Sequence, residues 1–251
     1  MVRRALLSVL VLGTVAFAGC AADTAEPAAE DDNLTEPTTP IRGDAAHESW
    51  AAVARSAGGH VHANGWATVI GIRGLGRDRS THDTRAQRTW DDLFVVLTRD
   101  GHARELDGST HPWELNAEAA TDANADGVPD VGMVRPGEYV VVGRGSARLT
   151  GGLPAFDVTR NGSGALPGFR DVNHDGIFDD AEREKSIARK DMVTAILFHR
   201  AAGGGAPVAI GCQVFDEPTM KTLIDAVGGP SARFNYVLVD ASSLDLAKLP
   251  R

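Results

Sequence analysis

Cysteine, positive charge and long hydrophobic runs are all scarce in this sequence of 251 residues. Two cysteines are too few for a disulfide-rich secreted scaffold. The formal net charge of −9 argues against a basic nucleic-acid-binding face, so we expect no nucleic-acid partner. The content of hydrophobic residues, 43%, is nevertheless high enough for a packed globular core.

The one long apolar run lies at the N-terminus. In residues 1–20, two arginines precede an apolar stretch too short for a stable membrane span, which is the pattern of an export signal. The stretch ends in Phe-Ala-Gly-Cys and resembles a bacterial lipobox, in which a signal peptidase cleaves before a cysteine whose thiol takes a lipid. We therefore predict lipidation at Cys20, with an ordinary cleaved signal peptide as the alternative. Several acyl chains together anchor a protein stably, so we expect an exported, lipid-anchored protein. Ala21, the residue after the lipidated cysteine, resembles the residue found there in lipoproteins sorted to the outer membrane. We therefore expect the protein at the periplasmic face of the outer membrane rather than at the inner membrane.

Residues 21–45 are rich in alanine, proline, threonine and acidic residues and contain no aromatic residue. A segment with so little apolar surface cannot form a core, so we predict a disordered tether. One globular domain is expected over residues 46–251, and we expect it to be a monomer.

The predicted domain alternates short apolar segments with polar turns. Strands are predicted over 61–72, 91–98, 102–106, 138–143, 153–159, 191–198 and 233–240. Helices are predicted over 46–57 and 181–190, and a third begins after Asp216 and ends at Gly228. The pattern predicts a mainly β domain of the α+β class with a few short helices, of which the helix near the C-terminus is the clearest.

Residues 171–182 match the calcium loop of EF-hands at every ligand position. The expected ligands, at loop positions 1, 3, 5, 7, 9 and 12, are Asp171, Asn173, Asp175, Ile177 through its carbonyl, Asp179 and Glu182. His174 at position 4 is expected to point away from the ion. Proline and glycine before the loop exclude the usual entering helix. We predict an EF-hand-like site for structural Ca²⁺, with a solvated acidic turn as the alternative.

A second loop at 122–130 repeats the first nine positions of this pattern. Its candidate ligands are Asp122, Asn124, Asp126 and Asp130. Position 12 is Met133, so the bidentate acid is missing, and Pro129 excludes an exiting helix. We treat this loop as a weaker second calcium site, with a turn that holds no ion as the alternative. Extracellular sites of this kind are usually structural, so Ca²⁺ is expected to order loops.

Cys212 is the one cysteine of the predicted domain. In an exported protein a free thiol is a liability unless it is buried or used. His199 ends the apolar segment upstream, and an imidazole beside a thiol raises its thiolate fraction and later protonates the leaving group. Gly211 would let the backbone approach a bound carbonyl, so that its N–H and that of Cys212 form an oxyanion hole. The alternatives are a small buried cysteine and a histidine bonded to backbone.

This arrangement resembles the L,D-transpeptidase catalytic domain, the YkuD-type fold, in which a strand ends in His-Gly and a Ser-His-Gly-Cys motif carries the nucleophile. His199, Gly211 and Cys212 match that pattern residue for residue, whereas Arg200 replaces the glycine after the histidine. Ala-Ile at 209–210 replaces Ser-His. The resemblance, over roughly residues 66 to 218, is to a divergent branch that ends in Gly-Cys-Gln. It implies a β-sandwich or barrel with a cysteine nucleophile and a histidine base.

The resemblance also implies an enzyme that acts on peptidoglycan stem peptides through an acyl-enzyme on Cys212. The acyl group would pass either to an amine, which gives a cross-link between stem peptides, or to water, which gives a trimmed stem peptide. Both outcomes stay open. An alternative from another class is a non-catalytic, calcium-binding envelope lipoprotein that uses the same fold for binding. A third alternative is a cysteine peptidase with a protein substrate.

Overall fold

The computed structural model of the chain describes residues 34–37, 39, 41–83, 89–110, 121–146, 154–201, 209 and 211–250. The predicted export signal, with Cys20, lies outside these residues. Within them, no helix has both the length and the apolar character that a membrane span requires.

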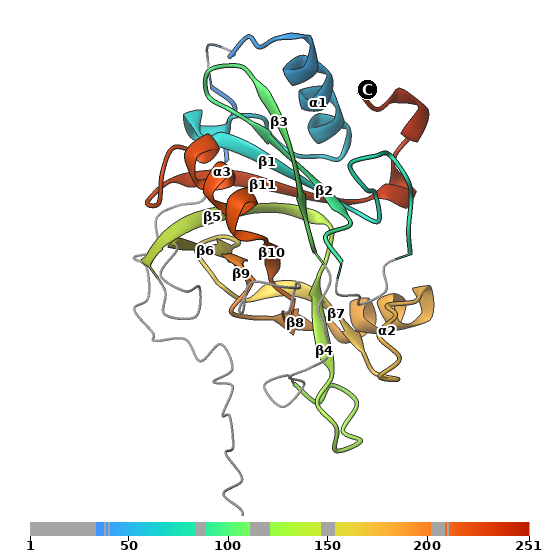
Figure 1. The fold of residues 1–251 in the computed structure, drawn as a ribbon. Coiled ribbons are helices and arrows are strands. Elements are labelled where there is room, and N and C mark those ends of the chain that lie inside the picture. The colour runs from blue at the N-terminus through green and yellow to red at the C-terminus, as the bar shows by residue number, and fades with distance from the viewer. Residues whose placement is uncertain are drawn as a thin grey trace, which may run out of the picture.

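Eight strands form one large sheet (Figure 1). In order across the sheet they are β10 (Gln213–Phe215), β9 (Leu197–Arg200), β6 (Pro154–Thr159), β5 (Gly137–Ser146), β11 (Arg233–Asp240), β1 (Ala67–Arg73), β2 (Asp92–Leu97) and β3 (Ala103–Gly108). β10 is parallel to β9, and β1 is parallel to β11. Directly after β3, Ser109 exchanges two backbone hydrogen bonds of 2.9 Å with Val214 of β10. The sheet is therefore nearly closed into a barrel, and the predicted mainly β, α+β fold with short helices is confirmed.

In the middle of the large sheet both faces are buried, because successive side chains of a strand alternate between two cores. On one face, Val69, Phe94 and Phe198 belong to a core that also contains one side of α3 (Glu217–Val227). On the opposite face, Ile70 and Val95 pack with α1 (Ala45–Ser56). We call the face that contacts α3 the inner face and its opposite the outer face.

A small sheet lies at one end of the barrel, in the lower part of Figure 1. It consists of β4 (Val131–Val134), β7 (Leu166–Asp171) and β8 (Met192–Val193), and α2 (Asp180–Arg189) packs beside it. Both aspartate-rich loops adjoin this sheet, since the loop at 122–130 leads into β4 and the loop at 171–182 joins β7 to α2. The strand β7 lies where an EF-hand would have its entering helix, so the helix that proline and glycine exclude is absent there, although the strand itself was not predicted.

The predicted helices agree with α1, α2 and α3 to within one or two residues. The single strand predicted over 191–198 is wrong, because the chain forms β8 and β9 there, in two different sheets. Ala195, with a φ of 56°, lies in the turn that carries the chain from one sheet to the other. The strand predicted from residue 61 starts later, at Ala67, because 63–65 form a 3₁₀ turn.

Contacts with the domain begin before residue 46. The carbonyl of Thr35 accepts a hydrogen bond from the backbone of Asn64, and the carboxylate of Glu36 accepts one from Arg55. Asp44 is the N-cap of α1, since its carboxylate accepts a 2.8 Å hydrogen bond from the backbone of His47. The end of the segment predicted as a tether therefore contributes to the described domain.

Candidate functional site

The predicted nucleophile and base lie on the same face of two neighbouring strands. In the parallel pairing of β10 with β9, Gln213 is opposite Phe198 and Val214 is opposite His199. Phe198 belongs to the inner core, so His199, one residue further along β9, turns outward. By the same alternation Cys212 turns outward beside Leu197, with which it shares a small apolar cluster. The structure therefore turns Cys212 and His199 to the same face of the sheet, with Cys212 level with Leu197, two residues before His199 on β9.

The Cys212 side chain is 3% exposed and is held by backbone groups. The N–H of Leu197 donates to its Sγ at 3.4 Å, and the thiol donates to the carbonyl of Ala195 at 3.6 Å. These contacts keep the sulfur close to the backbone just before β9.

The His199 imidazole is also buried. Its Nδ1 lies 2.7 Å from the carbonyl oxygen of Arg200, and because a carbonyl only accepts, Nδ1 must carry the proton. The neutral ring therefore presents Nε2 as its basic nitrogen. Burial lowers the pKa of His199 below its usual value, which keeps the ring neutral at pH 7. A neutral imidazole with a basic Nε2 is the form that a general base requires.

Gly211 joins this part of the large sheet to the small sheet. Its φ is +100°, and a Cβ at this position would lie 2.7 Å from the carbonyl oxygen of Gly132 in β4. On the other side, its carbonyl accepts a 3.4 Å hydrogen bond from Nε2 of Gln213. Gln213 is fully buried on the inner face, where Oε1 accepts a 2.8 Å hydrogen bond from the Tyr236 hydroxyl. Sequence reasoning noted Gln213 only as part of a motif and missed its positioning role, because its inward orientation depends on strand register.

The loop at 171–182 folds around its own carboxylates. The carboxylate of Asp171 accepts a hydrogen bond of 2.9 Å from Gly176, and Asp175 accepts one of 2.8 Å from Ile177. Glu182, from the first turn of α2, accepts bonds from the backbone of Val172 and Asn173. Asp179 caps α2 through the backbone of Glu182, so in the described structure its carboxylate serves the helix. Carboxylate oxygens of Asp171, Asp175 and Glu182 lie within 4.8 Å of one another.

Two buried oxygens in this loop have no hydrogen-bond partner among the described residues, namely Oδ1 of Asp171 and Oε2 of Glu182. Asp171 is 1% exposed and Glu182 is 4% exposed. Burial raises the pKa of Glu182 above its usual value, and the neighbouring carboxylates of Asp171 and Asp179 add to the rise. Converging, desolvated oxygens of this kind fit a hard cation, because Ca²⁺ takes six to eight oxygen ligands. The donor set therefore fits Ca²⁺.

The loop at 122–130 has the same local geometry. Asp122 accepts a hydrogen bond of 2.9 Å from Gly127, as Asp171 does from Gly176. Asp126 accepts one of 2.8 Å from Val128, and Asn124 accepts one of 3.1 Å from Asp126. In place of a position-12 acid, Asp130 closes the loop, because its Oδ2 accepts a 2.6 Å hydrogen bond from the backbone of Ala123. The similarity of the two sequences thus extends to their backbone folds.

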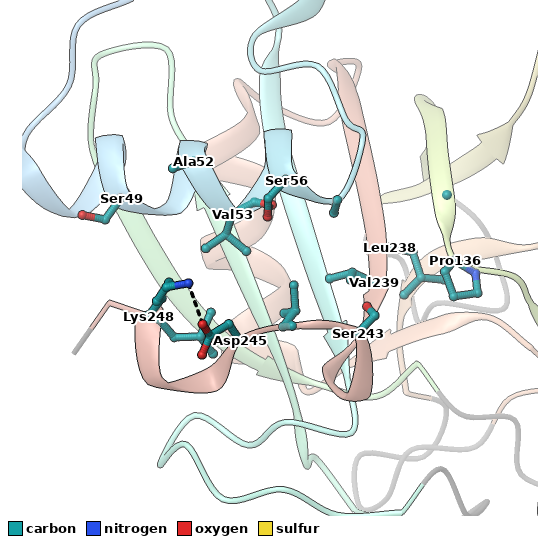
Figure 2. A pocket seen from close by; sticks show the side chains of 14 residues that line it. Ser49, Ala52, Val53, Ser56, Pro136, Leu238, Val239, Ser243, Asp245 and Lys248 are labelled. Atoms are coloured by element: carbon teal, nitrogen blue, oxygen red, sulfur yellow. Dashed lines mark hydrogen bonds and ion pairs between the residues drawn. The ribbon is translucent and has the colours of Figure 1, made fainter.

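A cavity of about 710 Å³ lies between α1 and the C-terminal segment. Figure 2 shows its lining, which includes the ion pair between Asp245 and Lys248. The hydroxyls of Ser49, Ser56 and Ser243 in this lining donate to backbone carbonyls. None of the predicted site residues lines this cavity in the described part of the chain, and it offers no activated nucleophile.

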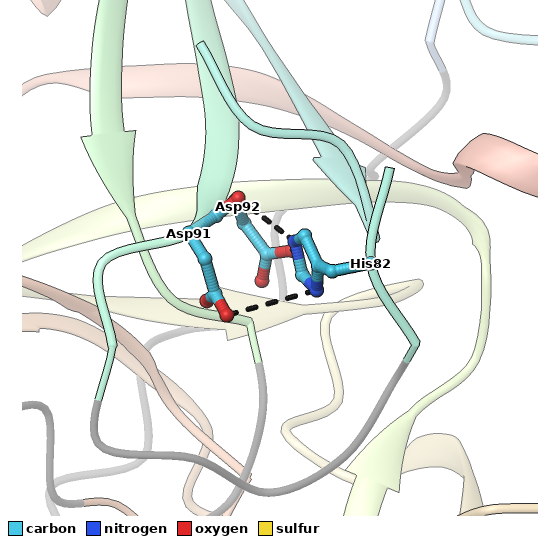
Figure 3. A group of neighbouring side chains, drawn as sticks. All are labelled: His82, Asp91 and Asp92. Atoms are coloured by element: carbon cyan, nitrogen blue, oxygen red, sulfur yellow. Dashed lines mark hydrogen bonds and ion pairs between the residues drawn. The ribbon is translucent and has the colours of Figure 1, made fainter. Parts of the chain in front are cut away.

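His82 lies with Asp91 and Asp92 in a group that could hold a metal by distance alone (Figure 3). Its two ring nitrogens, however, face the backbone carbonyls of Asp83 at 2.9 Å and Asp91 at 2.8 Å. Both nitrogens must then donate, so the ring is a cation. Hydrogen bonding to the Asp92 carboxylate is the largest cause that raises the pKa of His82 to about 9. The imidazolium thus supplies the positive charge that a metal would bring.

Comparison of the chain with protein-family models, with curated proteins and with solved structures finds no match.

Proposed function

We propose that the protein is a cell-envelope cysteine acyltransferase of L,D-transpeptidase type, lipid-anchored at Cys20, that acts on peptidoglycan stem peptides. The observation that carries the proposal is the pairing of β9 with β10, which turns Cys212 and His199 to the same side of adjacent strands. The Nδ1–H bond from His199 to Arg200 supports it further, because it leaves Nε2 as the basic atom.

In the proposed reaction, His199 Nε2 takes the proton of the Cys212 thiol. The sulfur then attacks the carbonyl on the L-centre of a diamino acid, with the backbone N–H groups of Gly211 and Cys212 as donors to the oxyanion. Collapse of the tetrahedral intermediate forms a thioester and breaks the bond to the terminal D-residue, whose amine receives the proton from His199. An amine or water then attacks the thioester and regenerates the thiol.

We further propose that the loop at 171–182 binds a structural Ca²⁺ through Asp171, Asn173, Asp175, Ile177 and Glu182. The two partnerless buried oxygens support this role, since burying a carboxylate oxygen without a partner is costly. When bound, the ion would neutralise these carboxylates and hold β7 to α2. It would take no part in the reaction at Cys212.

The test is a muropeptide assay with the purified full chain in the presence of Ca²⁺. Disaccharide tetrapeptides are the substrates, and liquid chromatography with mass spectrometry identifies the products. Loss of terminal D-Ala indicates trimming, and a 3→3 cross-linked dimer indicates transpeptidation. Cys212→Ala should abolish either product. If several stem peptides yield no product in the calcium-loaded protein, the enzymatic proposal fails.

The burial of the thiol favours a second candidate function, a non-catalytic calcium-binding envelope lipoprotein. Thiol labelling distinguishes the two functions. An active Cys212 should react with iodoacetamide at pH 7 in the native protein, at a rate far above that of an ordinary thiol. If Cys212 is labelled only after unfolding, the binding function is the better account.

A further inference from the structure

Two buried histidines join the first turn of α1 to the chain that enters β1. His47 of α1 is 1% exposed, and His62, just before the 3₁₀ turn, is 2% exposed. Their Nε2 atoms lie 2.8 Å apart. The two ring planes are within 8° of each other, and the ring centroids are 5.1 Å apart, as far as this contact between nitrogens allows. The rings therefore meet end to end, as a straight hydrogen bond between them requires.

The backbone around His62 determines which nitrogen of the neutral pair carries each proton. Nδ1 of His62 lies 2.9 Å from the carbonyl oxygen of Trp66, and because a carbonyl only accepts, this nitrogen carries the proton. Nε2 of His62 is then the acceptor, and Nε2 of His47 is the donor. Nδ1 of His47 is left as a bare, buried nitrogen with no hydrogen-bond partner among the described residues.

The pair can take one proton without losing its hydrogen bond. Nδ1 of His47 is free to receive it, and Oε1 of Glu48 lies 3.5 Å from this nitrogen. The same oxygen accepts a 2.9 Å hydrogen bond from the backbone of Gly43, which lowers the pKa of the Glu48 carboxyl below its usual value. Glu48 is therefore still negative in mild acid and faces the first proton.

A second proton breaks the pair. It would have to bind Nε2 of His62, where it would meet the N–H of His47 across 2.8 Å. Burial opposes this charge and lowers the pKa of His62 below its usual value, and the neighbouring His47 ring lowers it further. The closed pair therefore holds one extra proton and excludes the second.

The other charged groups around the pair already have partners. They form two pairs, each 3.1 Å apart, Glu36 with Arg55 and Asp44 with His102. On the side of β1 the printed contacts of His62 are neutral, namely the carbonyl of Trp66 and the hydroxyl of Thr68, which accepts a hydrogen bond from the His62 backbone. Glu48 is thus the carboxylate that a protonated His47 faces.

We propose that His47 and His62 form an acid-sensitive latch, which holds α1 to the barrel at neutral pH and releases it on acidification. In an open state each ring meets water and binds its own proton below about pH 6.5, whereas the closed pair keeps one. Opening then takes up one proton, so its equilibrium constant rises about tenfold for each pH unit below 6.5. Release loosens the barrel from the segment that leads back to Cys20. The latch does not depend on the reaction proposed for Cys212.

The test is hydrogen exchange of the purified full chain, read by mass spectrometry between pH 7 and pH 5. Protection factors correct for the intrinsic pH dependence of exchange, so they report the opening of α1. In the wild type, the protection of residues 45–56 should fall about tenfold between pH 6 and pH 5.

Two histidine variants make the result specific. His47→Gln keeps a donor to His62, but its amide can turn its oxygen towards a protonated His62, so opening takes up no proton and the protection of α1 should change less than about twofold. His60→Gln is the matched control. It removes a histidine that is 46% exposed and pairs with Glu138, and it should show the full loss of protection. Retained protection of α3 at pH 7 shows that each variant is folded.

Glu48→Gln tests the latch at an exposed position, since the Glu48 side chain is 53% exposed. It keeps an acceptor for Gly43 but removes the charge that faces Nδ1 of His47. The closed pair then takes no proton in this range, opening takes up two, and the protection of α1 should fall by up to about a hundredfold between pH 6 and pH 5. Constant protection of α1 in the wild type from pH 7 to pH 5 would overturn the proposal. A loss of protection that His47→Gln shares with the wild type would do so as well.

Discussion

At the scale of single residues, three histidines take different states because different atoms face their rings. His82 has acceptors at both nitrogens and is held as a cation. His199 has one acceptor and is buried, so it is neutral. His174 faces two carboxylates at distances too long for a hydrogen bond. The sequence shows three histidines in loops or at a strand end, and only the surrounding atoms differentiate them.

The raised pKa of His82 predicts a loss of stability at high pH. The folded-state pKa of His82, about 9, lies above its ordinary value of 6.5. The contribution of His82 to the free energy of unfolding is therefore full below pH 6.5 and is lost as the pH rises through 9. A shift of this size corresponds to at most about 3 kcal/mol. Urea denaturation between pH 6 and pH 10 should show this loss in the wild type. In His82→Gln it should be largely absent, and equal slopes in both proteins would contradict the assignment.

The lowered pKa of His199 predicts the acid limb of the proposed reaction. The base acts only when neutral, and burial keeps it neutral to a pH below its ordinary value of 6.5. The rate constant kcat/KM for tetrapeptide trimming or cross-linking should therefore stay level as the pH falls to 6.5 and decline only below it. His199→Gln should remove activity at every pH. An acid limb centred above 6.5 would show that the base is another group.

At the scale of elements, local chemistry specified most of the helices and strands. The aspartate N-cap, the helical spacing and the final glycines of α3 predicted its bounds, and short apolar segments predicted β2 and β11. The strands β4 and β7 escaped prediction because Gly132, Pro167 and Gly168 weaken their strand pattern. Their side chains are buried by neighbours distant in the sequence, and such burial leaves no local periodicity.

The turn before β10 depends on Gly211 for two separate reasons, its left-handed φ and the lack of space for a side chain. Gly211→Ala should lower the free energy of unfolding by at least about 2 kcal/mol, since strain and a backbone clash add. Gly228, the C-cap of α3, has a similar φ of 105° but no atom within 4 Å of a Cβ, so Gly228→Ala should cost only about 1 kcal/mol. Urea denaturation compares the two variants. Equal losses of unfolding free energy in the two variants would mean that the Gly132 carbonyl does not exclude a side chain at position 211.

At the scale of the whole molecule, a buried charge network joins the small sheet and α2 to the barrel. Arg73 of β1 pairs with Asp240 at 3.3 Å and donates to the carbonyl of Val134 at 3.0 Å. Asp240 also pairs with Arg183 of α2 at 2.7 Å. The network connects β1, β4, β11 and α2, so stability at either end of the molecule should depend on it.

Removal of the central guanidinium tests this dependence. Arg73 is fully buried, and Arg73→Met leaves Asp240 and Thr110 without one partner each, so a loss of about 3 kcal/mol is expected. Arg77→Met removes an exposed pair with Asp107 and should cost less than about 1 kcal/mol. Both values come from denaturant unfolding at pH 7. A loss below about 1 kcal/mol for Arg73→Met would contradict the role of the network.

Calcium should stabilise the whole molecule, because the loop at 171–182 is tied through α2 to this network. At 10 mM Ca²⁺ and a dissociation constant of about 10⁻⁴–10⁻³ M, the gain is roughly 1.4–2.7 kcal/mol. For the wild type, the midpoint of thermal unfolding, Tm, should be several degrees higher with Ca²⁺ than with excess chelator. Glu182→Gln should abolish the difference, while Glu184→Gln, on the exposed side of α2, should retain it. No difference in the wild type would exclude a calcium site.

The sequence by itself determined the mainly β class, the helix limits and the backbone of the two aspartate-rich loops, because each follows from interactions between residues close along the chain. Only the tertiary structure decided that residues 191–198 divide between two sheets, that Ser109 meets Val214, and that Asp130 closes its loop beside His174. These features join segments far apart in the sequence. Their geometry follows from register and from the path of the chain, neither of which is encoded in local spacing.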